Sequence, residues 1–259
     1  MERDIYQVFF DGNDLGASDF VDLYNHNFNN YPKRDVKIYK IARASKSIVT
    51  NAELTSKDIS VYMTICDGTR GGTERIISDV KSLLVAQTGE LVVLNAGIRL
   101  AWTASLNEFN TEWDGVTATC ELRFIASTPI GSSLTAYELF NIQNITTSTA
   151  NQTGFVQGSY ECEPVFTMVF SALDNTSGLG GFSLYNAKTN QGIDCSFPIL
   201  ANDIIIIDSK IKSVTQNGIQ RDFKGVFPRF DPNTQSLGYT DTYASRNVSI
   251  VVTYNINEV

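Results

Sequence analysis

The chain has 259 residues, of which 42% are hydrophobic, 11% aromatic and 19% charged. That composition indicates a folded globular protein, and no apolar run approaches the roughly 20 residues that cross a bilayer. The formal net charge is −8, and no cluster of Lys and Arg is interleaved with aromatic residues, so a nucleic-acid-binding function is not expected. An acidic surface could still line a passage for DNA.

The first residues and the cysteines indicate a cytoplasmic site of synthesis. Met1–Phe10 lacks the long apolar core of a signal peptide. The four cysteines are widely spaced, with no CxxC pair, and only one histidine, His26, is present, which argues against zinc. All four thiols are predicted to be reduced. The cysteines are Cys66, Cys120, Cys162 and Cys195.

The N-terminal part begins with a strand and an unusual polar segment. Ile5–Phe10 reads as a strand that ends in the turn Asp11–Asp14. That turn lacks the downstream Glu of a calcium-binding EF-hand loop. Asp19–Pro32 mixes aromatic residues with asparagines, so we interpret it as an extended arm that packs on another surface. Further strands are predicted at Val36–Ala42 and Ile59–Cys66.

One amphipathic helix is predicted over Thr73–Gln87. Its apolar residues recur at the spacing of a single helical face. Thr73 is the predicted N-cap, and Gly89 the predicted C-terminal stop. The apolar face consists of Ile76, Ile77, Val80, Leu83 and Leu84.

Alternating apolar residues predict a sheet after the helix. Strands are expected at Glu90–Leu94, Leu100–Leu106 and Val116–Phe124, with a polar turn at Asn107–Gly115 between the last two. The helix would then lie across this sheet.

The chain becomes polar and turn-rich at Asn141–Gly158, which favours a domain boundary between Ser127 and Gly158, near Ser133. We therefore predict one domain over residues 1–133 and another over residues 134–259. The second shows no helical pattern, and its closely spaced strand candidates are typical of a β-sandwich. Asn217-Gly218 is a strong hairpin signal and Asn190-Gln191-Gly192 a weaker one. The strand candidates are Val165–Ser171, Gly181–Tyr185, Ile193–Phe197, Asp203–Asp208, Ile211–Thr215, Ile219–Val226 and Asn247–Asn255.

The chain offers few residues for catalysis. A Ser-His-Asp or Cys-His site would have to be built around His26, and we do not expect one. Paired carboxylates for glycoside hydrolysis could be drawn from an acidic set, although surface solvation explains that set better. We predict no catalytic residues, no metal site and no cofactor. The acidic set is Glu161, Glu163, Asp194 and Asp208.

Several aromatic residues are candidates for stacking on sugars. Trp102 lies on an alternating apolar face and is predicted to be core. Trp113 and Tyr243 lie in polar segments and are the better surface candidates. For the group as a whole, packing in the core remains the favoured interpretation. The full set is Trp102, Trp113, Tyr185, Phe223, Phe227, Phe230 and Tyr243.

Three stretches together resemble the distal tail proteins of long-tailed siphophages. They are Val8–Leu15, the block from Glu90–Leu94 through Arg99–Trp102, and Ile204–Pro228, where "DIIIIDSKIKSVTQNG" (residues 203–218) is followed by "GVFPRF" (residues 225–230). The chain departs from the family pattern at Arg43–Leu54, which contains no glycine, and at Asp231-Pro232-Asn233, where Pro-Gly-Asn is usual.

The resemblance implies a mainly β protein of two domains. The first would be a ring-forming β-sandwich or split barrel with one helix at about residues 73–87, and the second a galectin-like or carbohydrate-binding-module-like β-sandwich. Six copies would form a ring at the virion tail tip, with the tail-tube protein, a tail hub or tail-associated lysin-like protein and a receptor-binding protein or adhesin as partners. A cell-surface saccharide is a further candidate partner. The alternatives are a carbohydrate-binding module or lectin-like adhesion protein, a major tail-tube protein and a glycoside hydrolase.

Overall fold

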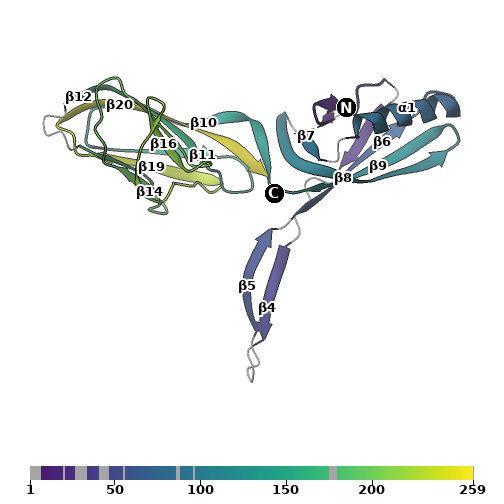
Figure 1. The fold of residues 1–259 in the computed structure, drawn as a ribbon, viewed down its shortest axis with the longest axis horizontal. Helices are drawn as coiled ribbons and strands as arrows, with labels where there is room; N and C mark the ends of the chain where they lie inside the picture. The colour runs from purple at the N-terminus through teal and green to yellow at the C-terminus, as the bar shows by residue number, and fades with distance from the viewer. Residues whose placement is uncertain are drawn as a thin grey trace. The chain divides into compact units, whose positions relative to one another are not determined.

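The computed structural model describes residues 7–19, 21–26, 34–40, 47–54, 56–85, 88–95, 97–174 and 180–258. The described residues form strands and a single α-helix, which confirms the predicted mainly β class. The chain divides into two compact units, Met1–Leu134 with Glu258–Val259 and Thr135–Asn257 (Figure 1). The separate roles predicted for two domains stay a prediction.

The first unit is built on antiparallel strands. β6 pairs with β3 and β9, β9 with β8, β8 with β7, β7 with β1, and β1 with β2. The strands are β1 (Gln7–Phe10), β2 (Asn13–Asp14), β3 (Val21–His26), β6 (Lys57–Ile65), β7 (Gly89–Asn95), β8 (Ile98–Asp114) and β9 (Thr117–Ala126).

The helix α1 (Arg70–Leu83) covers one face of this sheet, as Figure 1 shows. It buries Ile76, Ile77 and Val80, so the predicted apolar face is confirmed. Successive side chains of a strand point to opposite faces of the sheet. Every second residue of the strands beneath the helix therefore points toward it, and these residues form one core with the helix. These strand residues include Ile59, Val61, Met63, Ala118, Cys120, Leu122 and Phe124.

The predicted helix bounds were wrong at both ends. The N-cap is Thr69, whose side chain accepts a hydrogen bond from the Gly72 N–H. Thr73 is fully buried inside the helix, and its hydroxyl donates to the Val116 carbonyl at 2.8 Å. The helix ends at Leu83, and Gly89 begins β7 instead of ending the helix. A tertiary contact therefore explains a threonine that reads as a cap in the sequence.

The polar turn predicted at Asn107–Gly115 is also wrong, because β8 continues to Asp114. The register of β8 on β9 shifts between Leu106 and Glu108, which marks a β-bulge. An extra residue at a bulge changes which positions face the core. Trp102 and Ala104 are buried before the bulge, and Phe109 and Trp113 pack on the core after it.

The arm predicted at Asp19–Pro32 is in part a strand of the unit's own sheet. Residues 21–26 form β3, which pairs with β6, and Val21 and Leu23 pack against the core. Residues 27–32 lie outside the described residues. The stretch Arg43–Leu54, for which no strand was expected, contains β5 (Ser47–Leu54), which forms a hairpin with β4 (Arg34–Lys40).

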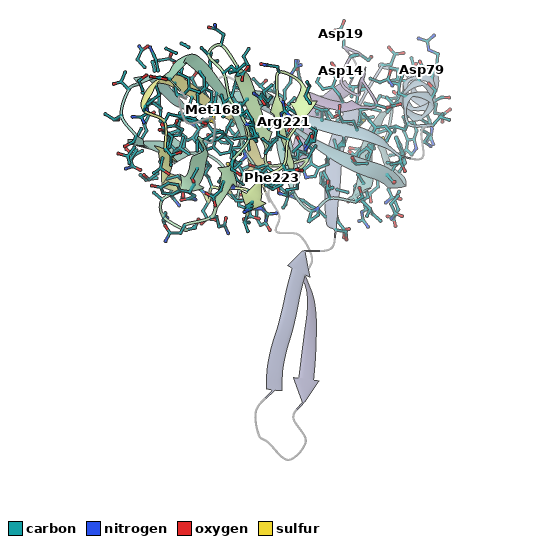
Figure 2. The ribbon with its side chains drawn as sticks, turned by 60° about the vertical axis from the view of Figure 1, so that its left-hand side comes forward. Asp14, Asp19, Asp79, Met168, Arg221 and Phe223 are labelled. Carbon is teal, nitrogen blue, oxygen red and sulfur yellow. The ribbon has the colours of Figure 1, made fainter. Side chains whose placement is uncertain are left out.

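The second unit has two antiparallel sheets whose inner faces meet, as the contact between the Phe170 and Phe182 rings at 5.8 Å shows. Figure 2 draws the side chains of this unit, with Met168 labelled among them. The first sheet contains β10 (Gly131–Ile145), β12 (Val165–Asp174), β15 (Ile204–Asp208), β16 (Ser213–Gln216), β17 (Ile219–Gln220) and β20 (Ser245–Glu258). The second contains β11 (Thr149–Val156), β13 (Phe182–Asn186), β14 (Gly192–Cys195), β18 (Lys224–Gly225) and β19 (Asn233–Asp241).

The polar stretch Asn141–Gly158 is strand for most of its length, not a linker. β10 extends through Ile145, and β11 pairs with β19 along eight positions. β11 ends the strand order of its sheet and alternates exposed with partly buried residues, so its polar composition reflects an edge strand. The predicted hairpin at Asn217-Gly218 is confirmed by left-handed φ angles of 50° and 81°.

The predicted strand Ile219–Val226 is two short strands in different sheets. β17 belongs to the first sheet and β18 to the second. The chain crosses between the sheets at residues 221–223, and Figure 2 labels Arg221 and Phe223 there.

Candidate functional surfaces

Most of the candidate aromatic residues are core. Trp102, Phe227, Phe230 and Tyr243 are each at most 5% exposed, so the prediction of a surface position for Tyr243 was wrong. Trp113 is half-buried, with the Arg70 guanidinium 4.6 Å from its ring centroid. Two of the set, Tyr185 and Phe223, are also half-buried.

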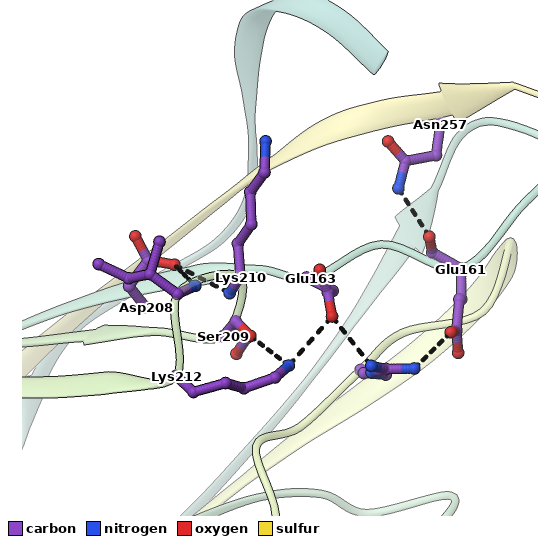
Figure 3. A network of polar contacts seen from close by, with 9 residues as sticks. Glu161, Glu163, Asp208, Ser209, Lys210, Lys212 and Asn257 are labelled. Carbon is purple, nitrogen blue, oxygen red and sulfur yellow. Dashed lines mark hydrogen bonds and ion pairs between the residues drawn. The ribbon is translucent and has the colours of Figure 1, made fainter. Parts of the chain in front are cut away.

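The four candidate carboxylates for glycoside hydrolysis already have partners. Glu161 forms an ion pair with Arg229 at 2.6 Å, and Glu163 contacts both Arg229 and Lys212 at 3.0 Å (Figure 3). Asp208 accepts hydrogen bonds from the backbone N–H groups of residues 210 and 211. Asp194 accepts one from the Ser183 hydroxyl at 2.5 Å. Surface solvation and ion pairing explain this acidic set.

The network in Figure 3 joins three loops of the second unit. Glu161 and Glu163 precede β12, Lys212 lies between β15 and β16, and Arg229 follows β18. The side chains of these four residues are 30–45% exposed, and an exposed pair is worth about 0–1 kcal/mol. The network links these loops, and the carboxylates of Glu161 and Glu163 are both ion-paired within it.

The four cysteines are free thiols of two kinds. Cys66 is exposed just after β6, and a hydrogen bond with Thr117 lowers the pKa of its thiol. The other three are buried. Burial raises the pKa of the Cys162 and Cys195 thiols to about 12, so these groups stay protonated. In the part of the chain that the structure describes, no three His, Cys, Asp or Glu residues gather as metal ligands would.

Two of the hollows formed by described residues lie on the first unit. One, of about 460 Å³, is lined by Tyr62, Glu108, Glu121 and Arg123 among others. Hydrogen bonds from Arg123 and Tyr62 hold the pKa of the Glu121 carboxyl below its usual value. The other, of about 340 Å³, lies between α1 and the far end of β8 and includes Trp113 in its wall.

The described helix is not long and apolar enough to cross a membrane.

A third hollow, on the second unit, has a volume of about 410 Å³ and includes Phe197 and Arg221 in its wall. Sequence reasoning missed both residues as site candidates. Phe197 lies two residues after β14, where it reads as the end of a strand, and Arg221 lies in the crossing between the sheets. No local motif distinguishes either residue.

No sequence model of a known protein family matches the chain, and no curated protein matches it. The structure nevertheless has the fold of a phage adsorption-hub protein. The crystal structure of SPP1 Dit, described as a paradigm of the hub adsorption apparatus in phages that infect Gram-positive bacteria, aligns with a TM-score of 0.68 and 15% identity. The alignment covers 97% of this chain and 99% of that one. The resemblance predicted from the sequence is thus confirmed at the level of fold.

A structure of the phage P2 baseplate in its activated conformation aligns more weakly. Its TM-score is 0.42 at 10% identity, with 97% of each chain covered. That score is too low to support an argument about shared function.

Proposed function

We propose that this chain is a structural protein of a phage tail tip, in the role of a distal tail protein. The observation that carries the proposal is the likeness in fold to SPP1 Dit over nearly the full length of both chains. The ion-paired state of Glu161 and Glu163 gives a glycoside hydrolase no support. A structural role needs no catalytic residue, metal or cofactor.

In this role six copies form a closed ring that joins the tail tube to the baseplate and its host-adhesion hub. Six copies carry a formal charge of −48, six times −8. If part of that charge lines the lumen, the wall repels the DNA phosphates, and DNA slides through without binding. The partners are the tail-tube protein, a tail hub or tail-associated lysin-like protein and a receptor-binding protein or adhesin. The protein is made in the host cytoplasm and functions in the virion.

Two alternatives make different predictions. A tail-tube protein assembles without a fixed end, whereas a closed ring stops at a fixed number of copies. A free carbohydrate-binding module or lectin binds sugar as a monomer. No described contact favours either alternative over the ring.

Mass photometry of the purified protein tests the ring. We expect a discrete species of about 172 kDa, six times the chain mass of 28.6 kDa. The measurement is repeated over a range of protein concentrations, so that a ring that dissociates on dilution is still detected. A continuous series of larger masses would favour the tube protein, and a monomer at every concentration would contradict spontaneous ring formation.

A further inference from the structure

The edge strand β11 of the second unit is long and open on one side. It runs over eight residues, and among the described strands it pairs with β19 alone. Its residues Ala150, Gln152 and Gly154 are only partly buried, as expected beside an open flank. A row of unpaired peptide groups of this length is a template on which another strand can add.

The pairing with β19 decides which peptide groups of β11 are free. The Asp241 N–H donates to the Ser148 carbonyl at 2.9 Å, so these two residues form a hydrogen-bonded pair in register with β11. Such pairs alternate with non-bonded pairs along an antiparallel ladder. The even-numbered residues of β11 therefore bond to β19, and the odd-numbered residues direct both backbone groups away from it. No described hydrogen bond uses the backbone groups of Asn151, Thr153 or Phe155.

The usual protections of a sheet edge are missing from β11. Natural edges are blocked by charged residues, proline, β-bulges or very short strands. Residues 141–158 contain no charged residue and no proline, although 19% of the chain is charged, and the register of β11 on β19 has no shift. The edge strands β17 and β18, by contrast, have two residues each. Two β11 edges can therefore approach without charge repulsion between them, in a chain whose net charge is −8.

We propose that β11 pairs with β11 of a second copy of this chain. In antiparallel pairing centred on Gln152, Asn151 of each copy lies opposite Thr153 of the other copy, and Thr149 lies opposite Phe155. All four residues direct their N–H and C=O groups toward the open flank, so the edge is complementary to itself about a two-fold axis. This self-complementarity favours a second copy over a different protein.

The pairing also covers apolar surface and extends the sheet. The Phe155 side chain, 62% exposed in the single chain, gains a β-branched neighbour on the facing strand. The two five-stranded sheets then continue as one sheet of ten strands. A two-fold contact closes on two copies, whereas a ring contact is head-to-tail. The proposal therefore goes beyond the proposed function and does not rest on it.

Sedimentation velocity of the full-length protein tests the proposal. A concentration range of about 1–300 µM is needed, because a single strand-edge contact is small among specific interfaces. We expect the mass of the main species to double as the concentration rises, from 28.6 kDa to twice that value for single chains. Where rings form, the doubling is from one ring to two. Absence of doubling at every concentration overturns the proposal.

One substitution removes the contact without disturbing β19. Thr153→Pro deletes an N–H that faces the open flank, and proline is tolerated at such edge positions. We expect it to weaken the association at least about tenfold, since each pair of copies loses two hydrogen bonds. Thr153→Val is the matched control, because it keeps the N–H and the β-branched shape, and it should associate like the wild type. Thermal unfolding shows that both variants are folded. Doubling that persists unchanged in Thr153→Pro overturns the proposal.

Amide hydrogen exchange of the wild type locates the contact without a variant. The amides of residues 151, 153 and 155 should exchange slowly only at the concentration where the mass has doubled. The amides of residues 150, 152 and 154 bond to β19 and should be protected at both concentrations. Equal exchange rates for residues 151, 153 and 155 at the two concentrations would contradict the proposal.

The proposal and the proposed function fail separately. Thr153→Pro lacks the edge contact, so mass photometry of this variant measures ring formation alone. A protein that forms rings but never doubles its mass refutes only the edge contact. A protein that doubles to two chains but forms no ring refutes only the ring.

Discussion

Replacing Lys57 by Met is predicted to stabilise the first unit. The Lys57 side chain is 1% exposed, and Nζ has no hydrogen-bond partner among the described residues. Burial lowers the pKa of this ammonium from 10.5 to about 8, against the attraction of Glu258. At about 1.36 kcal/mol per pKa unit, keeping the charge at pH 7 costs about 3 kcal/mol. The contact of Nζ with the Trp102 ring, at 5.4 Å, returns about 1 kcal/mol. Lys57→Met should therefore gain about 2 kcal/mol.

The gain should depend on pH in a defined direction. Because the folded-state pKa of Lys57 is below its unfolded value, the unfolded chain binds more protons between about pH 8 and 10.5. The stability penalty is thus fully present below about pH 8 and disappears as the pH rises toward 10.5. Urea unfolding of the wild type and of Lys57→Met at pH 7 and pH 9.5 measures the difference in their free energies of unfolding. Lys224→Met is the control, because Lys224 is exposed. No gain at pH 7, or the same gain at both pH values, would refute this reasoning.

Two further predictions concern the thiols and a buried ion pair. A thiol reagent should modify one cysteine, Cys66, in the native protein and four in denaturant, because the other three are buried. A native count of two or more would contradict the described burial. Asp241→Ala should cost about 3–5 kcal/mol in urea unfolding, because it leaves the Arg246 guanidinium, which lies 2.9 Å away, buried without its carboxylate partner. Glu163 is half-exposed, so Glu163→Ala should lower the free energy of unfolding by only about 1 kcal/mol or less. Equal losses for the two variants would show that the Asp241 pair is not buried.

The elements predicted best from the sequence are strands and a helix that bury one face, because their apolar residues recur at a regular spacing. Every second residue of β6 and of β9 is buried, and one face of α1 is apolar. Such patterns follow from the period of each secondary structure and need no knowledge of neighbours. The strand patterns already predicted a mainly β fold, and the family resemblance agreed with them; the comparison with SPP1 Dit supports that fold.

The elements that were missed depend on contacts distant in the chain. At the bulge in β8, the residues that face the core change from even-numbered to odd-numbered positions. The apolar alternation is therefore interrupted, and the sequence after Leu106 resembled a turn. β11 has few buried residues because it is an edge strand, so its composition resembled a linker. Thr73 reads as an N-cap in the sequence, but its hydroxyl donates to a carbonyl 43 residues away, and Thr69 caps α1 instead.

The hollow lined by Phe197 and Arg221 could not be predicted from the sequence for a similar reason. Asp203, Gln216 and Arg221 come from three separate segments, and only the pairing of β15, β16 and β17 brings them together. Each residue alone reads as an ordinary polar residue near a turn. Their arrangement is a property of the fold and not of a motif.

Immunogold electron microscopy of virions that contain this protein tests the proposed role most directly. An antibody raised against the purified chain should place gold at the end of the tail that lies farthest from the capsid, and at no other position. Label along the whole tail would indicate the tube protein. Absence of label from the tail would contradict the tail-tip assignment.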